Sequence, residues 1–451
     1  MTTNVIQTHG EIGASWLLDL VSDATRTGRL RLLYWNGREA HIAAKVERAM
    51  QNGANSTVIY VPMKIQPDVL RAMPLPKRAE SYGSTEELFK AVCSVFKKFT
   101  ALSEEYVALL GHAVLATWVV ESTEVPICVA LVGPAGPERR QLLRLLRCLF
   151  RRGLVLSGVN LANLSTLPMN LTPSLLIDHC EQNAALRTFL YATNSPEAHL
   201  AARGQLFNLC CAKVLCIDDP LDRSLRDFPV IQIPVVPRNS TLHLVDHRAQ
   251  KEILEEFQPK LLMYRLINLA KVRDSRFDPT DMHVPWRDVA GCLGASVAGD
   301  AGLQSKVTDL IKKQEEASQQ ESEKFFSVIV LEALLRLCHQ TEDSSLTVGA
   351  IAREANRLME ERGELISLQP RSVGSILRAL RIPTESLGAQ GRGIILLKEL
   401  RQRIHFIAKD HRINLGATKP GACQICFEVD PENGMHEDPQ KMTPEDLENW
   451  Y

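Results

Sequence analysis

The sequence lacks a net charge, a long hydrophobic run and an internal repeat of fixed period. Its 52 Lys and Arg residues are balanced by 53 Asp and Glu residues, so the net charge of −1 favours no class of partner by itself. The longest apolar stretch, residues 106–120, contains His112 and is shorter than the ~18 residues that a membrane-spanning helix needs. The first residues lack the basic and apolar regions of a secretory signal. We therefore expect a cytoplasmic protein without a membrane partner.

Cysteine is present, but without the pattern of a disulfide framework. The 11 cysteines are odd in number and scattered, and several lie in apolar segments that resemble strands or helices, at Cys93, Cys128, Cys148, Cys216 and Cys338. This distribution is typical of reduced, buried thiols in the cytoplasm. The hydrophobic fraction of 45% excludes wholesale disorder, and a length of 451 residues corresponds to roughly three domains.

Short apolar runs alternate with helical patterns between residues 125 and 236. The runs VPICVALVG, GLVLS, SLLID, AKVLCID and VIQIPVV are each bounded by Gly, Pro or polar residues. Continuous Val, Ile and Leu runs of this length are typical of parallel strands that are buried on both faces. Their alternation with helices predicts an α/β domain with a parallel sheet.

A glycine-rich turn follows the first of these runs and leads into the helical pattern QLLRLLRCLF. Strand, turn and helix are the context of a P-loop, whose pattern G-x-x-x-x-G-K-[ST] aims backbone N–H groups at phosphates. Gly133 matches the first glycine, whereas Glu138, Arg139 and Arg140 replace the second glycine, the lysine and the hydroxyl residue. The Glu138 carboxylate would repel a phosphate, and Arg140 cannot ligate Mg²⁺. Asp178 ends the run SLLID, where a Walker-B carboxylate would lie.

The segments ALVGPAGPERRQLLRLL and PSLLIDHC resemble GPxGSGKTTLLRLL and PTLLIDEAD of P-loop ATPase-like proteins, which are related to the DNA helicases and primase-helicases of phages and mobile elements. The resemblance covers residues 84–240 as an order and spacing of segments. It implies a sensor strand near residues 191–195 and a phosphate-facing arginine, Arg223, in the segment DRS. The chain departs from the family at the loop and at His179, so hydrolysis does not follow. A residual phosphate site would comprise Gly133, Gly136, Arg139 and Asp178, and a tight turn without any ligand is the alternative.

Residues 326–415 contain three helical patterns followed by a glycine-tipped hairpin. The third pattern, PRSVGSILRALRI, places Val373 and Leu377 on its apolar face and polar residues on the other. Three helices, a hairpin and a basic third helix match a winged helix-turn-helix, which places the third helix in the major groove of DNA. RSVGSILRAL and GRGIILL also resemble the C-terminal winged helices of the same primase-helicase relatives. The predicted DNA-binding residues are Arg371, Ser372, Ser375, Arg378, Arg381 and, on the wing, Arg392.

Local charge supports this interpretation. Residues 367–415 carry 9 basic and 3 acidic residues, whereas residues 416–451 carry 2 basic and 8 acidic residues. A basic region attracts the phosphate backbone of DNA, and an acidic tail could pair with that region instead. A further basic cluster is interpreted as a solvated helix face, and it comprises Arg139, Arg140, Arg144, Arg147, Arg151 and Arg152.

The tail contains a Cys-x-x-Cys spacing that two zinc ligands would use. Cys423 and Cys426 form this pair, but a structural zinc ion needs four ligands and a second Cys/His pair is missing downstream, where only His436 follows. His405 and His411 could join only if the tail folded back on the last helix. We therefore predict no metal.

These patterns predict an α/β P-loop-like domain, a helical region, a C-terminal winged helix and a small mixed α+β N-terminal region. The predicted segments are 1–83 with a linker, 84–240 as the P-loop-like domain, 241–325 as a helical region with a linker, 326–415 as the winged helix and 416–451 as an acidic tail. The predicted function is DNA association, in which a non-hydrolysing P-loop-like domain acts as a scaffold or oligomerisation unit and needs no cofactor. The alternatives are an ATP- and Mg²⁺-dependent helicase component that uses Asp178 and Arg223, and a pair of protein-interaction modules.

Overall fold

The computed structural model of the chain divides into two compact units, residues 1–315 and 316–451. It describes residues 2–13, 15–25, 28–49, 56–158, 167–195, 197, 199–202, 205–221, 225, 228–236, 243–340, 345–364, 366–411, 413 and 424–429. Within these residues, no helix combines the length and the apolar character that crossing a membrane requires.

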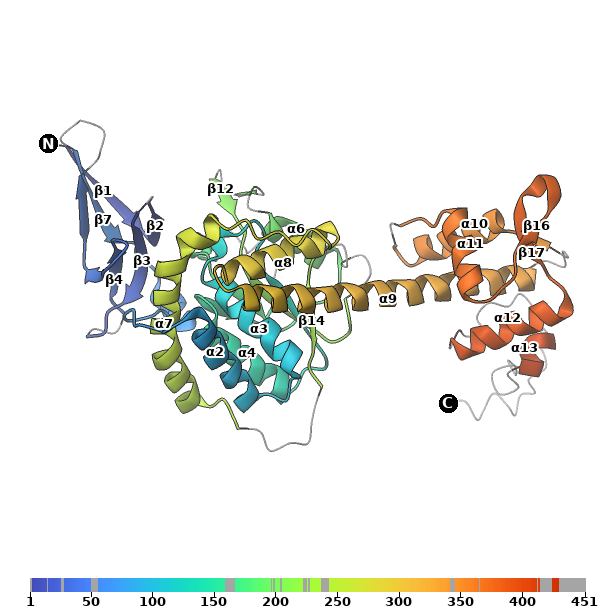
Figure 1. The fold of residues 1–451 in the computed structure, drawn as a ribbon, viewed down its shortest axis with the longest axis horizontal. Coiled ribbons are helices and arrows are strands. Elements are labelled where there is room, and N and C mark those ends of the chain that lie inside the picture. The colour runs from blue at the N-terminus through green and yellow to red at the C-terminus, as the bar shows by residue number, and fades with distance from the viewer. Residues whose placement is uncertain are drawn as a thin grey trace, which may run out of the picture. The chain divides into compact units, whose positions relative to one another are not determined.

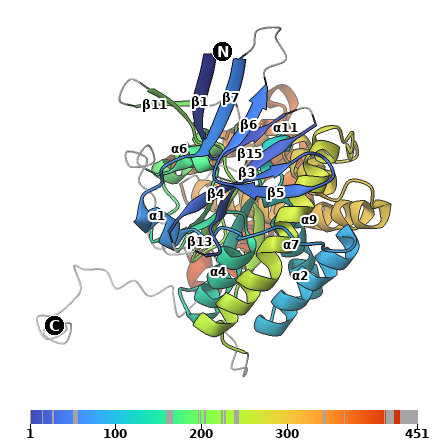
Figure 2. The same ribbon diagram turned by 90° about the vertical axis from the view of Figure 1, so that its left-hand side faces the viewer.

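The first strands of the chain form two small sheets at the N-terminus (Figures 1 and 2). The first sheet has the order β1-β7-β6 and contains β1 (Thr2–Thr8), β6 (Val46–Ala49) and β7 (Ser56–Pro62), with β1 parallel to β7. The second is antiparallel, in the order β2 (Gly10–Ile12), β3 (Leu17–Ser22), β4 (Leu30–Trp35) and β5 (Ala40–Ala43). Leu18 and Leu20 of β3 enter a local core, whereas Leu17 and Val21 pack into the main core of the unit. Side chains alternate along a strand, so Asp19 lies on the side of the main core.

The predicted parallel sheet is confirmed. Within the described residues it has the order β14-β8-β13-β10-β9, and all its pairings are parallel. Its strands are β8 (Cys128–Val132), β9 (Gly153–Leu156), β10 (Ser174–Ile177), β13 (Lys213–Ile217) and β14 (Ile231–Pro234). Val129 and Leu131 of β8 enter one core, while Cys128 and Ala130 enter another on the opposite face. Burial on both faces explains why the strand sequences are continuous apolar runs.

Helices cover both faces of this sheet. The face of Val129 and Leu131 packs against α2 (Thr85–Phe99), α3 (Glu104–Thr117), α4 (Pro137–Leu149), α7 (His247–Arg273) and α8 (Val284–Ser296). Figure 2 shows α2, α4 and α7 next to one another. The other face packs against α6 (Ala184–Asn194). The remaining elements of this unit are α1 (Pro67–Ala72), η1 (Val120–Ser122), η2 (Met169–Leu171), β11 (His199–Ala202) and β12 (Gln205–Asn208).

One expectation about local structure is wrong. Residues 191–195 were assigned to a sensor strand, but residues 191–194 are the last turn of α6, and the strand between β8 and β10 is β13. Residues 312–324 lie inside α9 (Ala301–Gln340), and the boundary between the two units falls within this charged segment. Lys, Glu and Gln are good helix formers, so a charged segment without glycine or proline can extend a helix.

The second unit is built on the C-terminal part of α9. It contains β15 (Ser345–Thr347), α10 (Val348–Glu361), α11 (Pro370–Ala379), β16 (Glu385–Ser386), η4 (Gly388–Gln390), β17 (Arg392–Ile395), α12 (Lys398–Asp410) and α13 (Gln424–Val429). The strands pair antiparallel in the order β15-β17-β16. Leu334, Ile351, Leu377 and Ile404 from the four longer helices meet in one core.

Candidate functional site

The glycine-rich turn after β8 has a conformation that only glycine accommodates at its first position. Gly133 has φ 145°, and a Cβ atom there would lie 2.2 Å from the Val235 carbonyl oxygen. The Gly133 N–H donates to the carbonyl oxygen of Ile217 at the end of β13 (3.0 Å). Gly136 is the N-cap of α4, and Pro137 takes the first helical position, where its fixed φ is suited.

Arg139, at the position of the P-loop lysine, is turned into the protein. Its side chain is 2% exposed, and Nη1 donates to the Gly133 carbonyl oxygen (2.8 Å) and to Asp218 Oδ1 (2.7 Å). Asp218 follows β13 directly and is 56% exposed. The cation that would face a phosphate is therefore neutralised by the protein's own carboxylate. Its buried Nε has no hydrogen-bond partner among the described residues.

Carboxylates surround the place that a phosphate would take. Glu138 is half-buried, and its Oε2 lies 3.4 Å from the position of a Cβ atom on Gly136, so its charge lies against the turn. Asp178 follows β10, is half-buried and lies at the same edge of the sheet as Asp218, because the carboxyl ends of parallel strands share one edge. The structure thus brings Gly133, Gly136, Arg139 and Asp178 to one edge. It adds two acidic side chains that disfavour an anion.

An apolar cavity of about 160 Å³ lies beside the start of α4. Its lining includes Phe99, Leu102, Tyr106, Gln141, Leu142 and Val235, and Glu138 also reaches it. Gln141 is used structurally, since its Nε2 donates to the carbonyl oxygens of Phe99 (2.7 Å) and His243 (2.8 Å). The cavity can accept a flat apolar group, but this amide is not free to recognise one.

The six arginines around α4 do not form one solvated face. Arg140 and Arg144 are exposed and Arg147 is half-buried, as a helix face allows. Arg139, Arg151 and Arg152, in contrast, are each 2% exposed, so the prediction is wrong for these three. Arg151 and Arg152 lie beyond the end of α4, where the chain turns into β9, and this position carries them into the interior.

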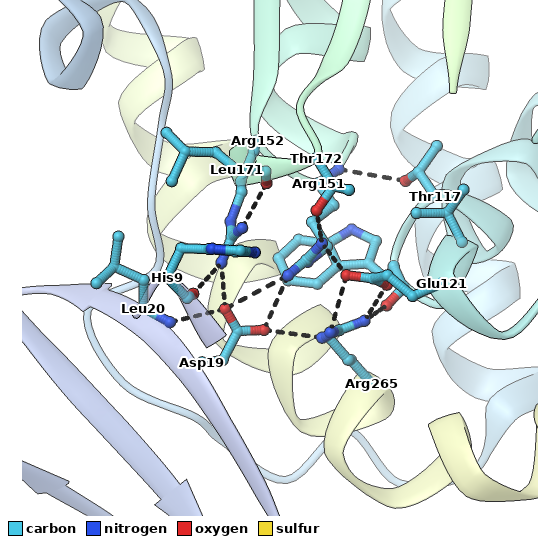
Figure 3. A network of polar contacts seen from close by, with 12 residues as sticks. His9, Asp19, Leu20, Thr117, Glu121, Arg151, Arg152, Leu171, Thr172 and Arg265 are labelled. Atoms are coloured by element: carbon cyan, nitrogen blue, oxygen red, sulfur yellow. Dashed lines mark hydrogen bonds and ion pairs between the residues drawn. The ribbon is translucent and has the colours of Figure 1, made fainter. Parts of the chain in front are cut away.

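Arg151 and Arg152, together with Arg265 of α7, converge on Asp19 of the N-terminal sheet (Figure 3). Asp19 accepts hydrogen bonds from Arg151 Nη2 (3.2 Å), Arg152 Nη2 (2.6 Å), Arg265 Nε (2.8 Å) and the Leu20 N–H (2.7 Å). All four ionised side chains are at most 3% exposed. Burial opposes the charged form of Asp19, but the three guanidinium groups outweigh it and lower the pKa of this carboxyl group.

Glu121 of η1 completes the network (Figure 3). It accepts from Arg151 Nη1 (2.7 Å), Arg265 Nη1 (2.7 Å) and Arg265 Nη2 (3.1 Å). Burial disfavours its charge, yet Arg151 and Arg265 lower the pKa of Glu121 to about 2. The network joins β3, the segment before β9 and the middle of α7, so it is structural and does not face solvent as a site would.

In the second unit, α11 presents a basic face. Arg371, Ser372, Ser375, Arg378 and Arg381 are all exposed, while Val373 and Leu377 on the opposite face are completely buried. Among the described residues, no carboxylate forms an ion pair with these three arginines. Four of these five residues lie on α11, and Arg381 follows the helix with a φ of 57°. Arg392 differs, because its Nη2 donates to the carbonyl oxygen (2.8 Å) and hydroxyl (3.0 Å) of Thr384 on its own hairpin.

Some predicted residues lie outside the described residues, namely Arg223 with its neighbours in the DRS segment, Cys423 and His436. Other important residues were missed. Asp218 ends a strand in the same way as Asp178, so the segment KVLCID contained a usable signal. Asp19 lies inside the apolar segment LLDLVS, and an acid at such a position indicates a buried partner.

No family model and no curated protein matches the chain. Among solved structures, it is similar to a full-length MCM homolog from Methanopyrus kandleri, with 14% identity, a TM-score of 0.34 and coverage of 66% of this chain and 76% of that one. It is also similar to the C-terminal region of NrS-1, with 12% identity, a TM-score of 0.33 and coverage of 84% and 96%. A third similar structure, Drosophila ORC bound to DNA, has 14% identity, a TM-score of 0.16 and coverage of 73% and 87%. Similarities at this level assign no family, ligand or activity to the chain.

Proposed function

We propose that this protein binds DNA through a winged helix in residues 326–415, and that its P-loop-like domain is a scaffold that does not hydrolyse nucleotide. The observation that carries the proposal is the exposed face of α11 with Arg371 and Arg378, together with Arg381 two residues after the helix. These three arginines are exposed and free of ion pairs within the described residues. Two guanidinium groups on one face of a helix, with a third just beyond the end of that helix, fit the phosphates and guanine edges of a major groove.

The order of elements supports this proposal. The chain runs through α9, β15, α10, α11, β16, β17 and α12, so a helix pair precedes a small antiparallel hairpin, as in a winged helix. The Thr384 contacts of Arg392 hold the wing arginine at the hairpin, so we assign this residue to phosphate contact at its edge rather than to base reading. The P-loop-like domain would then serve as a platform or as a surface for self-association.

Replacing Arg371, Arg378 and Arg381 together by alanine is expected to weaken duplex DNA binding about 100-fold at low salt. Each lost contact is expected to reduce the binding free energy by roughly 1 kcal/mol. Three such losses, about 3 kcal/mol together, raise the dissociation constant about 100-fold. Loss of phosphate contacts should also flatten the slope of log affinity against log salt concentration by about two to three. Fluorescence anisotropy with a labelled duplex between 50 and 200 mM salt measures both quantities.

A matched control removes the same charge elsewhere. Arg248, Lys251 and Lys260 lie on α7, each near a glutamate four residues away, and their triple alanine variant should bind DNA like the parent. Equal losses in both triple variants, or absence of duplex binding by the parent, would contradict the proposal. ATP turnover stimulated by DNA in the parent would favour the helicase-component alternative instead.

The acidic tail is expected to weaken DNA binding by competing for the basic face. Residues 430–451 contain seven acidic residues and one lysine. Their net charge of −6 is therefore the same as the net charge of the whole tail, residues 416–451. A deletion must start after α13, because Cys426 and Val429 are 2% and 7% exposed and belong to the core of the second unit. Removing residues 430–451 should tighten DNA binding several-fold at 50 mM salt, and the difference should vanish at high salt, where charges are screened.

The control for this deletion keeps the length of the tail. Exchanging its seven acids for Asn and Gln should tighten binding as much as the deletion does, since charge is the cause. If the deletion leaves affinity unchanged at 50 mM salt, the tail does not compete with DNA.

A further inference from the structure

Three side chains with metal-binding atoms converge beneath the last helices of the second unit. They are His339 near the end of α9, His405 on α12 and Cys426 on α13. The two Nε2 atoms are 3.0 Å apart, and Cys426 Sγ lies 3.2 Å from His339 Nε2. All three donor atoms lie within 4.8 Å of one another.

The distances between these nitrogen and sulfur atoms are close to the distances between ligand atoms around one tetrahedrally coordinated metal ion. Zinc–nitrogen bonds of about 2.0 Å and zinc–sulfur bonds of about 2.3 Å place two ligand atoms roughly 3.3–3.6 Å apart. Small rotations of the three side chains would lengthen the distances between their donor atoms to these values. Two imidazole nitrogens and a thiolate form a ligand set that suits Zn²⁺ better than Mg²⁺ or Ca²⁺, which prefer oxygen.

The histidine on α12 is already oriented as a ligand. His405 Nδ1 lies 2.7 Å from the carbonyl oxygen of Arg401, so Nδ1 carries the proton and the lone pair of Nε2 points into the cluster. The residue is 1% exposed. A neutral imidazole is the form that binds a metal.

We propose that His339, His405 and Cys426 supply three of the four ligands of a zinc ion that fastens α13 to the rest of the second unit. A helix of six residues such as α13 is too short to be stable alone. Lys409 Nζ also holds its end by donating to the Val429 carbonyl oxygen (3.0 Å). Cys423, three residues earlier in the sequence, lies outside the described residues, and the proposal rests on the three described ligands. It does not depend on the proposed DNA binding.

The test is the zinc content and cobalt spectrum of the full-length chain. The full-length protein, purified without chelators, should contain one zinc ion per chain when its metal content is measured by elemental mass spectrometry. After the zinc is exchanged for Co²⁺, the visible spectrum should show intense tetrahedral bands and a sulfur-to-cobalt charge-transfer band. Absence of stoichiometric zinc together with absence of these bands would overturn the proposal.

Substitutions locate the ion. His405→Ala should weaken zinc binding at least about 100-fold in a chelator competition, since even outer partners of a ligand change metal affinity 10- to 100-fold. His411→Ala is the matched control, because His411 is exposed at the end of the same helix and should leave zinc binding unchanged. Equal zinc affinity in both variants would place the ion elsewhere and overturn the proposal.

A ligand exchange covers the case in which the alanine variant does not fold. Cys426→His keeps a ligand at this position, so it should retain one zinc ion while the charge-transfer band of its cobalt form loses intensity. An unchanged band would mean that Cys426 is not a ligand, which contradicts the proposal.

Discussion

Replacing Asp19 by alanine is expected to destabilise the first unit by about 3–5 kcal/mol, the cost of removing one partner from a buried ion pair. Arg151, Arg152 and Arg265 all donate to this carboxylate and are at most 3% exposed, so their charges would remain buried with Glu121 as the remaining described acid of the network. Denaturant unfolding followed by tryptophan fluorescence measures the change. Four of the five tryptophans lie in residues 1–315, at positions 16, 35, 118 and 286, so the signal reports mainly this unit.

The control is an exposed ion pair. Asp68→Ala removes the partner of Arg71, and both side chains are more than three-quarters exposed, so the expected loss is below about 0.5 kcal/mol. A double-mutant cycle of Asp19→Asn with Arg152→Leu should show strong coupling, since the two side chains share a hydrogen bond. A loss from Asp19→Ala as small as that from Asp68→Ala would contradict this account of the network.

The same network predicts how stability changes with pH. The folded-state pKa of Asp19 and of Glu121 lies below the ordinary value, and that of Glu121 falls from 4.5 to about 2. Carboxyl groups with a lowered pKa stabilise the protein above their unfolded pKa and lose this contribution as the pH falls through the folded value. The parent should therefore lose stability steeply between about pH 4.5 and pH 2, and Asp19→Asn should show a smaller slope there.

Replacing Glu138, Arg139 and Arg140 by Gly, Lys and Thr is expected to create ATP binding at the turn after β8. The change removes the carboxylate that lies against the turn and the guanidinium that Asp218 holds. It supplies a lysine for the β- and γ-phosphates and a hydroxyl for Mg²⁺, while Gly133 and the start of α4 keep their positions. Isothermal titration with Mg²⁺ and ATP should give saturable binding in the triple variant and none in the parent at millimolar nucleotide.

Two further variants separate the causes. Glu138→Gly alone should not bind ATP, because Arg139 would still be paired with Asp218. Adding Asp178→Ala to the triple variant should weaken binding only in the presence of Mg²⁺, since a Walker-B carboxylate acts through the metal. ATP turnover by the parent would contradict the proposal of a non-hydrolysing scaffold, and saturable ATP binding by the parent would contradict the account of the pairing of Arg139 with Asp218.

The sequence predicted those parts of the fold that depend on local pattern. Apolar runs between turn residues identified the parallel strands. Gly133 and Asp178 each follow directly after one of these strands, which placed both residues at one edge of the sheet. The helical character of α11 followed from the spacing of its apolar residues, with Val373 and Leu377 buried. These features are set by neighbours in sequence, so one sequence suffices to recognise them.

The parts that were missed depend on contacts between distant residues. Asp19 and Arg265 are separated by 246 positions, and neither local sequence indicates that the two residues are in contact. Residues 191–195 were predicted to be a strand because the segment resembles a family motif. The spacing of the preceding Leu186, Phe189 and Leu190 is helical, and α6 continues through Asn194. His339 lies near the end of α9, and only the packing of α12 and α13 places His405 and Cys426 beside it.

The pairing of Arg139 with Asp218 has a consequence for regulation. A partner carried on the same chain acts at an effective concentration of about millimolar or above, independent of the supply of small molecules in the cell. Its cation is buried, so added salt screens this pair less than it screens a pair on the surface. In the proposed scaffold, the turn after β8 would therefore hold one conformation whatever the ratio of ATP to ADP. DNA occupancy would then follow ionic strength and the charge of the tail, and it would not follow the energy state of the cell.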